Sequence, residues 1–223
     1  MALQDRKQRQ FERREQDILT ASLELCSTPR WESVTVEQIA ERAEVGKGTV
    51  YKHFASKDEL LFRLMMRFYR GLLRMLREEM TGASPLEQLR DAVERALRYH
   101  IAHGEYRYVV EYCERIDFKE RANPAWRDDF LELDRAFQVW AGPIIEAGMA
   151  TGQFQPRPVQ QVMLGLHACF KGAVSLIWAG SEWYSMGDDQ SVVAAASDFM
   201  VAGLSGRSFL EGQGPRAERL RPN

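Results

Sequence analysis

Apolar residues recur three and four positions apart along almost the whole 223-residue chain. This spacing places them on one face of an α-helix, and we find no convincing run that alternates apolar and polar residues as a half-exposed strand would. The sequence therefore predicts an all-α fold. Proline- and glycine-containing stretches separate the predicted helices. In the second part of the chain these helices are expected at about 85–103, 105–118, 124–150, 158–180 and 188–205.

Four helices are predicted before residue 81. The first ends before Pro29, and Thr35 opens the second, where Gln38 three positions later completes a capping box. A short turn then leads into a third helix over residues 48–54. Ser56 caps the fourth, which has acidic residues in its first turn, where they meet the positive end of the helix dipole.

The second and third helices have the spacing of a helix-turn-helix. Val50 and Phe54 lie four positions apart and are predicted to face the core. The opposite side of this short helix is small and polar. It carries Gly48, Thr49 and Lys52, flanked by Tyr51 and His53, with Lys47 at its amino end.

Such a surface suits the major groove of DNA. Gly48 would let the backbone come close, Thr49 and Tyr51 can donate to phosphates, and Lys52 can reach a guanine edge or a phosphate. Lys57, at the amino end of the fourth helix, offers a further phosphate site. For any one residue, solvation of an exposed face is the simpler interpretation. The combination of capped helices, short turn and amphipathic helix favours DNA binding.

A resemblance to the amino-terminal DNA-binding domain of TetR/AcrR-type transcriptional regulators covers about residues 10–65. It is carried by ESVTVEQIAERAEVGKGTVYKHFASKDELL, preceded by RREQDILTASLELCSTPRW. The order T-V-x-x-I-A-x-x-A, K-G-T-V-Y-x-H-F, S-K-x-x-L is more specific than a generic helix-turn-helix. The resemblance implies that Thr35 caps its helix and touches a phosphate, that Lys47 and Lys52 lie where bases are read, that Thr49, Tyr51 and His53 contact the DNA backbone, and that Lys57 clamps a phosphate.

Two residues of the turn depart from the family pattern. Glu44 stands where glycine is commonest, and Gly46 replaces the usual serine cap. Glycine is a tolerable cap. Glu44 is expected to be strained if the turn requires a positive φ, because a side chain disfavours that conformation.

The resemblance implies a helix-turn-helix domain at 1–57, an effector-binding and dimerisation domain at 58–206, and a tail at 207–223 that is expected to be flexible. The stretch GMATGQFQPRPVQQVMLGLHACFKGAVSLIWAG, together with 188–205, looks like the two helices per subunit that form the family's dimer bundle. Small residues at Gly165, Ala168, Gly172 and Ala173 would permit close helix approach. Packing inside one subunit is the alternative.

Aromatic and polar residues of the second domain are candidates to line an effector pocket. They are Tyr99, His100, His103, Tyr112, Cys113, Phe137, Trp140, His167 and Phe170. Such a lining suits an apolar or amphipathic molecule, although aromatic residues at helical spacing more often pack a core. The spacing of His100 and His103 is only a faint zinc pattern, so neither a metal nor another cofactor is expected.

Charge and cysteine content bear on the partner and on the cellular compartment of the protein. The net charge of −2 does not by itself indicate a nucleic-acid partner, but cations crowd the amino end. The three scattered cysteines form no CxxC pair, which fits a reducing cytosol. The chain starts without an apolar signal-peptide core, and the apolar stretch 163–180 contains His167 and Lys171, which argues against a membrane span. A cytoplasmic protein is predicted.

Motifs typical of enzymes are missing: the sequence has no GxGxxG, P-loop, GxSxG or HExxH. We therefore expect no enzyme, but a ligand-responsive transcriptional regulator, more specifically a repressor. It would bind a palindromic DNA operator as a homodimer and be released by a small effector. The alternative is a helical small-molecule-binding protein or enzyme without a sequence-specific role on DNA.

Overall fold

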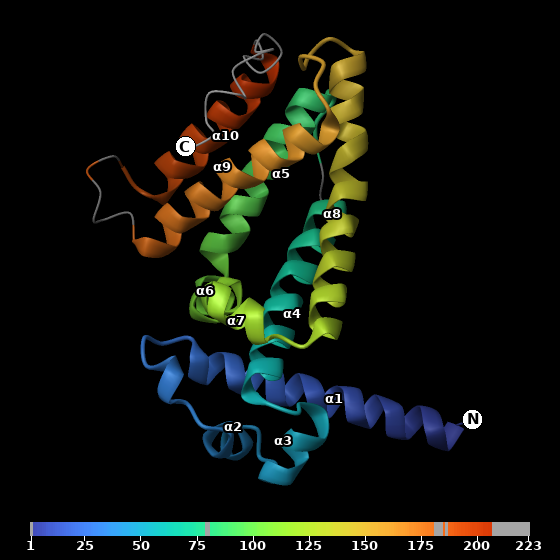
Figure 1. Ribbon diagram of the computed structural model, residues 1–223, viewed down its shortest axis with the longest axis vertical. Coiled ribbons are helices and arrows are strands. Elements are labelled where there is room, and N and C mark those ends of the chain that lie inside the picture. Colours follow the sequence, from blue (N-terminus) through green and yellow to red (C-terminus); the bar gives the residue numbers. More distant parts are fainter. Residues whose placement is uncertain (1, 79–80, 181–184, 186, 207–223) are drawn as a thin grey trace, which may run out of the picture. The chain divides into compact units, whose positions relative to one another are not determined.

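A computed structural model describes residues 2–78, 81–180, 185 and 187–206, with side chains from residue 5 onward in these ranges. Within them the regular elements are all helical, as predicted (Figure 1). The predicted tail at 207–223 lies outside the described residues. The α-helices are α1 (Ala2–Cys26), α2 (Val36–Arg42), α3 (Lys47–His53), α4 (Lys57–Glu78), α5 (Pro85–Ala102), α6 (Arg107–Glu114), α7 (Ile116–Arg121), α8 (Pro124–Ala150), α9 (Val159–Ala179) and α10 (Asp189–Ser205), with 3₁₀ turns η1 (Trp31–Ser33) and η2 (Gly104–Tyr106).

The predicted caps are present. Thr35 Oγ1 accepts from the Gln38 amide at 3.2 Å, and Gln38 Oε1 accepts from the Thr35 amide at 2.8 Å. The Ser56 hydroxyl accepts from the Glu59 amide at 3.1 Å. These side chains satisfy amides that the first turn of a helix leaves without partners. Local sequence therefore determines where α2 and α4 begin.

The predicted helix over 105–118 is wrong in detail, because the segment breaks into η2, α6 and α7. Arg115 is extended between α6 and α7, with φ −63° and ψ 147°. Its guanidinium binds the Asp117 carboxylate at 2.8 Å and lies 4.0 Å from Glu32. Neither glycine nor proline marks this break in the sequence, and the contact with Glu32 is remote along the chain.

The chain forms two compact units, residues 1–75 with 102–135 and residues 76–101 with 136–223. The first, called the head unit below, joins α1 and the helix-turn-helix to most of α4, to α6 and α7, and to the start of α8. The predicted boundary between residues 57 and 58 falls inside this unit. The second, called the distal unit, contains α9, α10 and most of α5.

The core of the head unit is apolar and closely packed. Ile18 of α1, Ile39 of α2 and Leu64 of α4 are fully buried. Val50 and Phe54 are each 2% exposed, which confirms that this face of α3 points inward. Burial of each such side chain stabilises the fold by about 1.5–3 kcal/mol. One face of α3 therefore packs against the core of the head unit, and the opposite face is exposed to solvent.

In the distal unit, Gly148 of α8 is required by packing. A Cβ at this position would lie 2.1 Å from the ring of Phe154, which is itself 2% exposed. We expect Gly148→Ala to lower the free energy of unfolding by about 1–3 kcal/mol, because a buried ring must move. Gly48→Ala in α3 meets no neighbour within 4 Å and should instead raise the free energy of unfolding by about 0.5–1 kcal/mol. Urea unfolding of both variants tests this difference, and equal effects would contradict it.

Candidate nucleic-acid interface

The turn between α2 and α3 has the hydrogen bonds of a Schellman motif. The Val45 amide donates to the Ala40 carbonyl at 2.9 Å, and the Glu44 amide donates to the Glu41 carbonyl at 3.0 Å. Glu44 has φ 53°, and among the described residues other than glycine it alone has a positive φ. The strain expected from the sequence is therefore present. Gly46 follows as the extended N-cap of α3, without a side chain to accept from the helix.

Glu44→Gly should raise the free energy of unfolding by about 0.5–1 kcal/mol. The substitution removes the steric cost of the left-handed conformation, and part of this gain is offset by the greater freedom of glycine in the unfolded chain. Glu44→Ala keeps the strain and serves as the control. If chemical denaturation showed the same gain for both variants, loss of the carboxylate rather than relief of φ would be responsible.

The outward face of α3 is polar and accessible. Lys47, Gly48, Tyr51 and Lys52 are exposed, and a Cβ at Gly48 would meet no atom within 4 Å. Within the described part of the chain, Lys52 has no ion pair or hydrogen bond. Protein packing thus explains neither the glycine nor the free lysine on this face.

Lys47 is held from two sides. Its ammonium pairs with the carboxylate of Glu37 in α2 and lies 5.9 Å from the centre of the Tyr51 ring. The hydrogen bond from Lys47 lowers the pKa of Glu37 below its ordinary value. An exposed pair of this kind contributes little stability and can open to a competing anion. An anion that binds Lys47 would have to displace the Glu37 carboxylate.

His53 does not lie on the outward face, contrary to the prediction that it flanks this surface. Its side chain is 3% exposed, and its ring stacks on Phe11 of α1 with centroids 3.9 Å apart. Nδ1 lies 3.9 Å from the Glu15 carboxylate and has no hydrogen-bond partner among the described residues. The stack joins the end of α3 to α1, so the His53 side chain positions α3 and does not belong to its outward face.

Lys57 also has a structural role that its sequence position did not reveal. Its ammonium donates to the carbonyls of Val34 at 2.7 Å, Glu32 at 3.0 Å and Trp31 at 3.3 Å. An ammonium group has three protons, and here all three are engaged. Lys57 ties the loop before α2 to the start of α4, so the phosphate contact predicted for it would require the loss of these bonds.

A second tie joins α4 to α6 and α7. The Tyr112 hydroxyl donates to the Asp58 carboxylate at 2.7 Å, and Arg121 donates to the other Asp58 oxygen at 3.0 Å and to the Tyr112 hydroxyl. Burial, followed by the hydrogen bond to Asp58, raises the pKa of Tyr112 to about 12. The Tyr112 ring also lies 4.7 Å from Trp31. Sequence reasoning missed this network, because its members are distant in the chain and no local spacing connects them.

The nine predicted ligand-binding residues are divided between the two units. His103, Tyr112 and Cys113 belong to the head unit. Cys113 is 2% exposed, and burial raises the pKa of its thiol. Since the Tyr112 hydroxyl is bonded to Asp58, these residues fit a packed core better than the wall of a pocket.

In the distal unit the predicted ligand-binding residues differ in burial and do not form one cluster. His100 is 2% exposed, its Nδ1 lies 2.7 Å from the Ala96 carbonyl, and its ring lies 5.3 Å from that of Phe170. Trp178 completes the cluster and donates to the His100 carbonyl at 3.1 Å. Tyr99, Phe137 and Trp140 are half-buried, whereas His167 lies on the exposed side of α9. The structure brings His100 and Phe170 together and leaves His167 outside their cluster.

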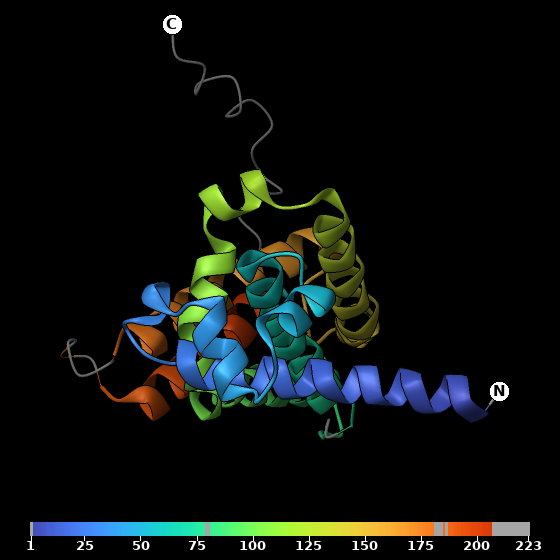
Figure 2. The same cartoon turned by 90° about the horizontal axis from the view of Figure 1, so that it is seen from below.

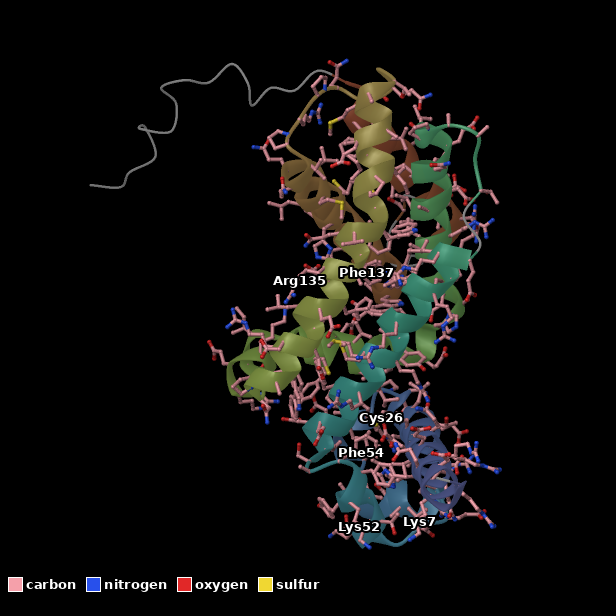
Figure 3. The ribbon with its side chains drawn as sticks, turned by 90° about the vertical axis from the view of Figure 1, so that its right-hand side faces the viewer. Lys7, Cys26, Lys52, Phe54, Arg135 and Phe137 are labelled. Atoms are coloured by element: carbon pink, nitrogen blue, oxygen red, sulfur yellow. The ribbon has the colours of Figure 1, made fainter. Side chains whose placement is uncertain are left out.

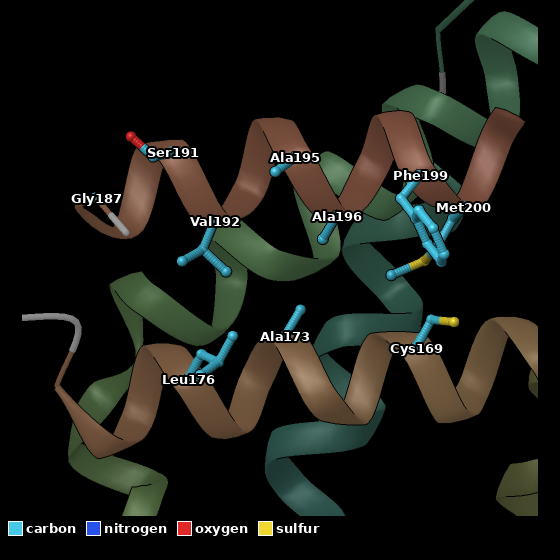
Figure 4. Close-up of a pocket in the computed structure, with 10 residues that line it drawn as sticks. All are labelled: Cys169, Ala173, Leu176, Gly187, Ser191, Val192, Ala195, Ala196, Phe199 and Met200. Carbon is cyan, nitrogen blue, oxygen red and sulfur yellow. The ribbon is translucent and has the colours of Figure 1, made fainter. Parts of the chain in front are cut away.

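An apolar groove of about 460 Å³ lies between α9 and α10 in the distal unit. Figure 4 shows Val192 and Ala196 of α10 facing Leu176 and Ala173 of α9 across it. None of the nine predicted ligand-binding residues lines this groove. α9 is long and apolar enough to cross a membrane, yet 28% of its most apolar window is buried within the chain. Most of the apolar face thus lacks a cover in the single chain.

Known proteins match both the sequence and the fold. A sequence profile described as "Bacterial regulatory proteins, tetR family" matches residues 18–64. The "HTH-type transcriptional regulator TcmR" of Streptomyces glaucescens is 33% identical over 217 residues, which is 95% of this chain and 91% of that protein. The "HTH-type transcriptional repressor KstR2" of Mycolicibacterium smegmatis is 23% identical over 202 residues, covering 89% of this chain and 93% of its own.

Among solved structures, a bacterial regulatory protein in the tetR family from Rhodococcus RHA1 superposes with a TM-score of 0.68. It is 16% identical and covers 87% of this chain and 98% of its own, so it supports the fold. The exposed polar face of α3 and these matches agree. The chain belongs to the TetR family and is a helix-turn-helix transcriptional regulator, not an enzyme.

Proposed function

We propose that the protein is a homodimeric repressor that reads a palindromic DNA operator with α3 of each subunit and is released by a small apolar or amphipathic effector. The observation that carries the DNA-binding part is the outward face of α3. It combines Lys47, Gly48, Tyr51 and Lys52 on a helix whose other face is buried. Cationic and hydroxyl groups on an accessible short helix suit phosphates and base edges in the major groove.

Dimerisation is supported by the uncovered apolar face of the distal unit. Leu164 of α9 and Phe199 of α10 are 71% and 70% exposed. Gly165 and Gly172 have open space where a Cβ would be, so packing within the chain does not demand glycine there. A second copy seated on α9 and α10 would bury this face by two-fold symmetry. Two subunits would also present two reading helices to successive turns of DNA.

Repression is proposed because relatives such as KstR2 are named repressors, and occupancy of a promoter needs no additional surface. The effector would bind in the distal unit, where half-buried aromatic residues such as Tyr99, Phe137 and Trp140 could form an apolar site. We place this DNA-binding protein in the cytoplasm, without a membrane partner.

The experiment that tests this proposal is selection of bound fragments from random-sequence DNA at two salt concentrations. A palindrome with half-sites about one helical turn apart is expected. The logarithm of the protein's affinity for this palindrome should fall linearly with the logarithm of the salt concentration, because phosphate contacts release counterions. Binding without sequence preference, or no binding, would contradict the proposal and favour a ligand-binding protein without an operator.

Gly48→Ala should separate stability from DNA binding. The free energy of unfolding is expected to rise by about 0.5–1 kcal/mol, because alanine is the better helix former. Affinity for the selected operator should fall at least about tenfold if the backbone of α3 approaches DNA closely, since a methyl group then costs about 1.4 kcal/mol or more. Gly104→Ala, at another exposed glycine whose Cβ would meet no atom within 4 Å, is the control and should keep its affinity. Unchanged operator affinity in Gly48→Ala would show that α3 does not approach DNA at this residue.

A further inference from the structure

Helix α1 extends beyond the core of the head unit. The side chains of residues 5–13 are exposed, and the first buried one is Ile18. Figures 1 and 2 show the amino-terminal end of α1 running past α2 and α3. The matched family profile begins at residue 18, after this extension.

The extension is strongly cationic. Five cations and two carboxylates give residues 5–14 a net charge of +3, and they are Arg6, Lys7, Arg9, Arg13 and Arg14 against Asp5 and Glu12. In the described part of the chain, none of the five cations forms an ion pair. An exposed helix with this net positive charge attracts anionic partners such as DNA phosphates.

The Phe11 contact determines which face of α1 adjoins the reading helix. Because the Phe11 ring stacks on His53, the last residue of α3, the Phe11 face of α1 is turned toward α3. Lys7 and Arg14 lie four positions before and three positions after Phe11, and so share this face. Arg9 and Arg13 are each two positions from Phe11, about 200° around the helix, and lie on the other side.

Lys7 and Lys52 project from the same edge of the head unit, whereas Cys26 and Phe54 lie inside it (Figure 3). The face of α1 that carries Lys7 therefore continues the accessible cationic surface of α3. Lys7 and Arg14 are separated by about 10 Å along the helix axis, which matches about three nucleotide steps of one DNA strand.

We propose that Lys7 and Arg14 bind phosphates of DNA beside the bases read by α3, so that α1 lengthens the footprint of each head. The inference rests on the proposed operator binding and adds residues that the helix-turn-helix pattern does not contain. The contact is electrostatic and carries no sequence information, because phosphates are the same at every base pair. The stack of Phe11 on His53 fixes the direction in which the cations are presented.

The test compares two double variants that lose the same charge. Lys7→Gln with Arg14→Gln removes the proposed contacts, and Arg9→Gln with Arg13→Gln removes two cations from the opposite side. The probe is a 40-base-pair duplex recovered with the wild-type protein from random-sequence DNA. Each lost phosphate contact should lower the slope of log affinity against log salt by about 0.9, and affinity at 0.1 M salt by about eightfold.

The first double variant should therefore lose a slope of about 1.8 and up to about sixtyfold in affinity for each bound subunit, with its preferred sequence unchanged. The opposite-face variant should change by less than about threefold. Thermal unfolding of both is expected to match the wild type, because the substituted side chains form no ion pair in the described part of the chain.

Equal losses in both variants would overturn the inference, since they would reflect net charge and not contact. Unchanged binding in both would also overturn it, while leaving the proposed function intact because the wild type still binds. Failure of the wild type to bind any duplex would instead defeat the proposed function. Phosphatidylserine vesicles are a further probe, and a loss confined to vesicle binding in the first variant would assign this face to a membrane surface and overturn the DNA contact.

Discussion

Replacing Phe199 with arginine should convert the proposed dimer into a monomer and weaken operator binding by about 100- to 10,000-fold. Phe199 is 70% exposed at the groove between α9 and α10. In a two-fold interface the substitution appears twice, so two guanidinium groups would be buried without partners. A monomer also loses the effective concentration that one bound head confers on the other. Sedimentation velocity and titration of the selected duplex measure the two effects.

Val139→Arg is the control for this substitution. Val139 lies on α8 of the same unit and is 73% exposed, but it does not line the groove. Its arginine variant should remain dimeric and bind the operator like the wild type. A Phe199→Arg protein that stays dimeric would show that the subunits meet elsewhere, and the uncovered face of α9 and α10 would then need another partner.

Substitution of Lys57 by methionine should lower the free energy of unfolding by about 3 kcal/mol. The ammonium holds the carbonyls of Trp31, Glu32 and Val34, and hydrogen bonds from a charged group contribute about 1.5–3 kcal/mol. Methionine preserves most of the apolar stem, so the loss would report on the ammonium. Denaturant unfolding, monitored together with operator titration, provides the measurement.

Lys52→Met is the matched control, because Lys52 is exposed on α3. Its stability should stay within about 0.5 kcal/mol of the wild type, while its operator binding should weaken by about 1–3 kcal/mol. If Lys57→Met were instead as stable as the wild type and had a salt slope smaller by about 0.9, Lys57 would be the phosphate ligand that its sequence position suggested.

The amino-acid sequence alone determined most of the helices and the outward face of α3, but not the break between α6 and α7. Thr35 with Gln38, and Ser56 with Glu59, act over three residues, so their hydrogen bonds could be anticipated from spacing. The inward position of Val50 followed from helical periodicity in the same way. The strain at Glu44 was also predictable, because the turn demands a conformation that glycine adopts most easily.

Only the tertiary structure decided which partners the side chains at the ends of these helices contact. His53 has an outward position by helical periodicity, yet α1 covers it with Phe11. Lys57 satisfies carbonyls more than twenty residues earlier, and Tyr112 gives its hydroxyl to Asp58 and so leaves the predicted pocket. Helix periodicity and capping are set by neighbouring residues, whereas these partners come from distant segments. The sequence around one side chain does not say which distant group will become its hydrogen-bonding or packing partner.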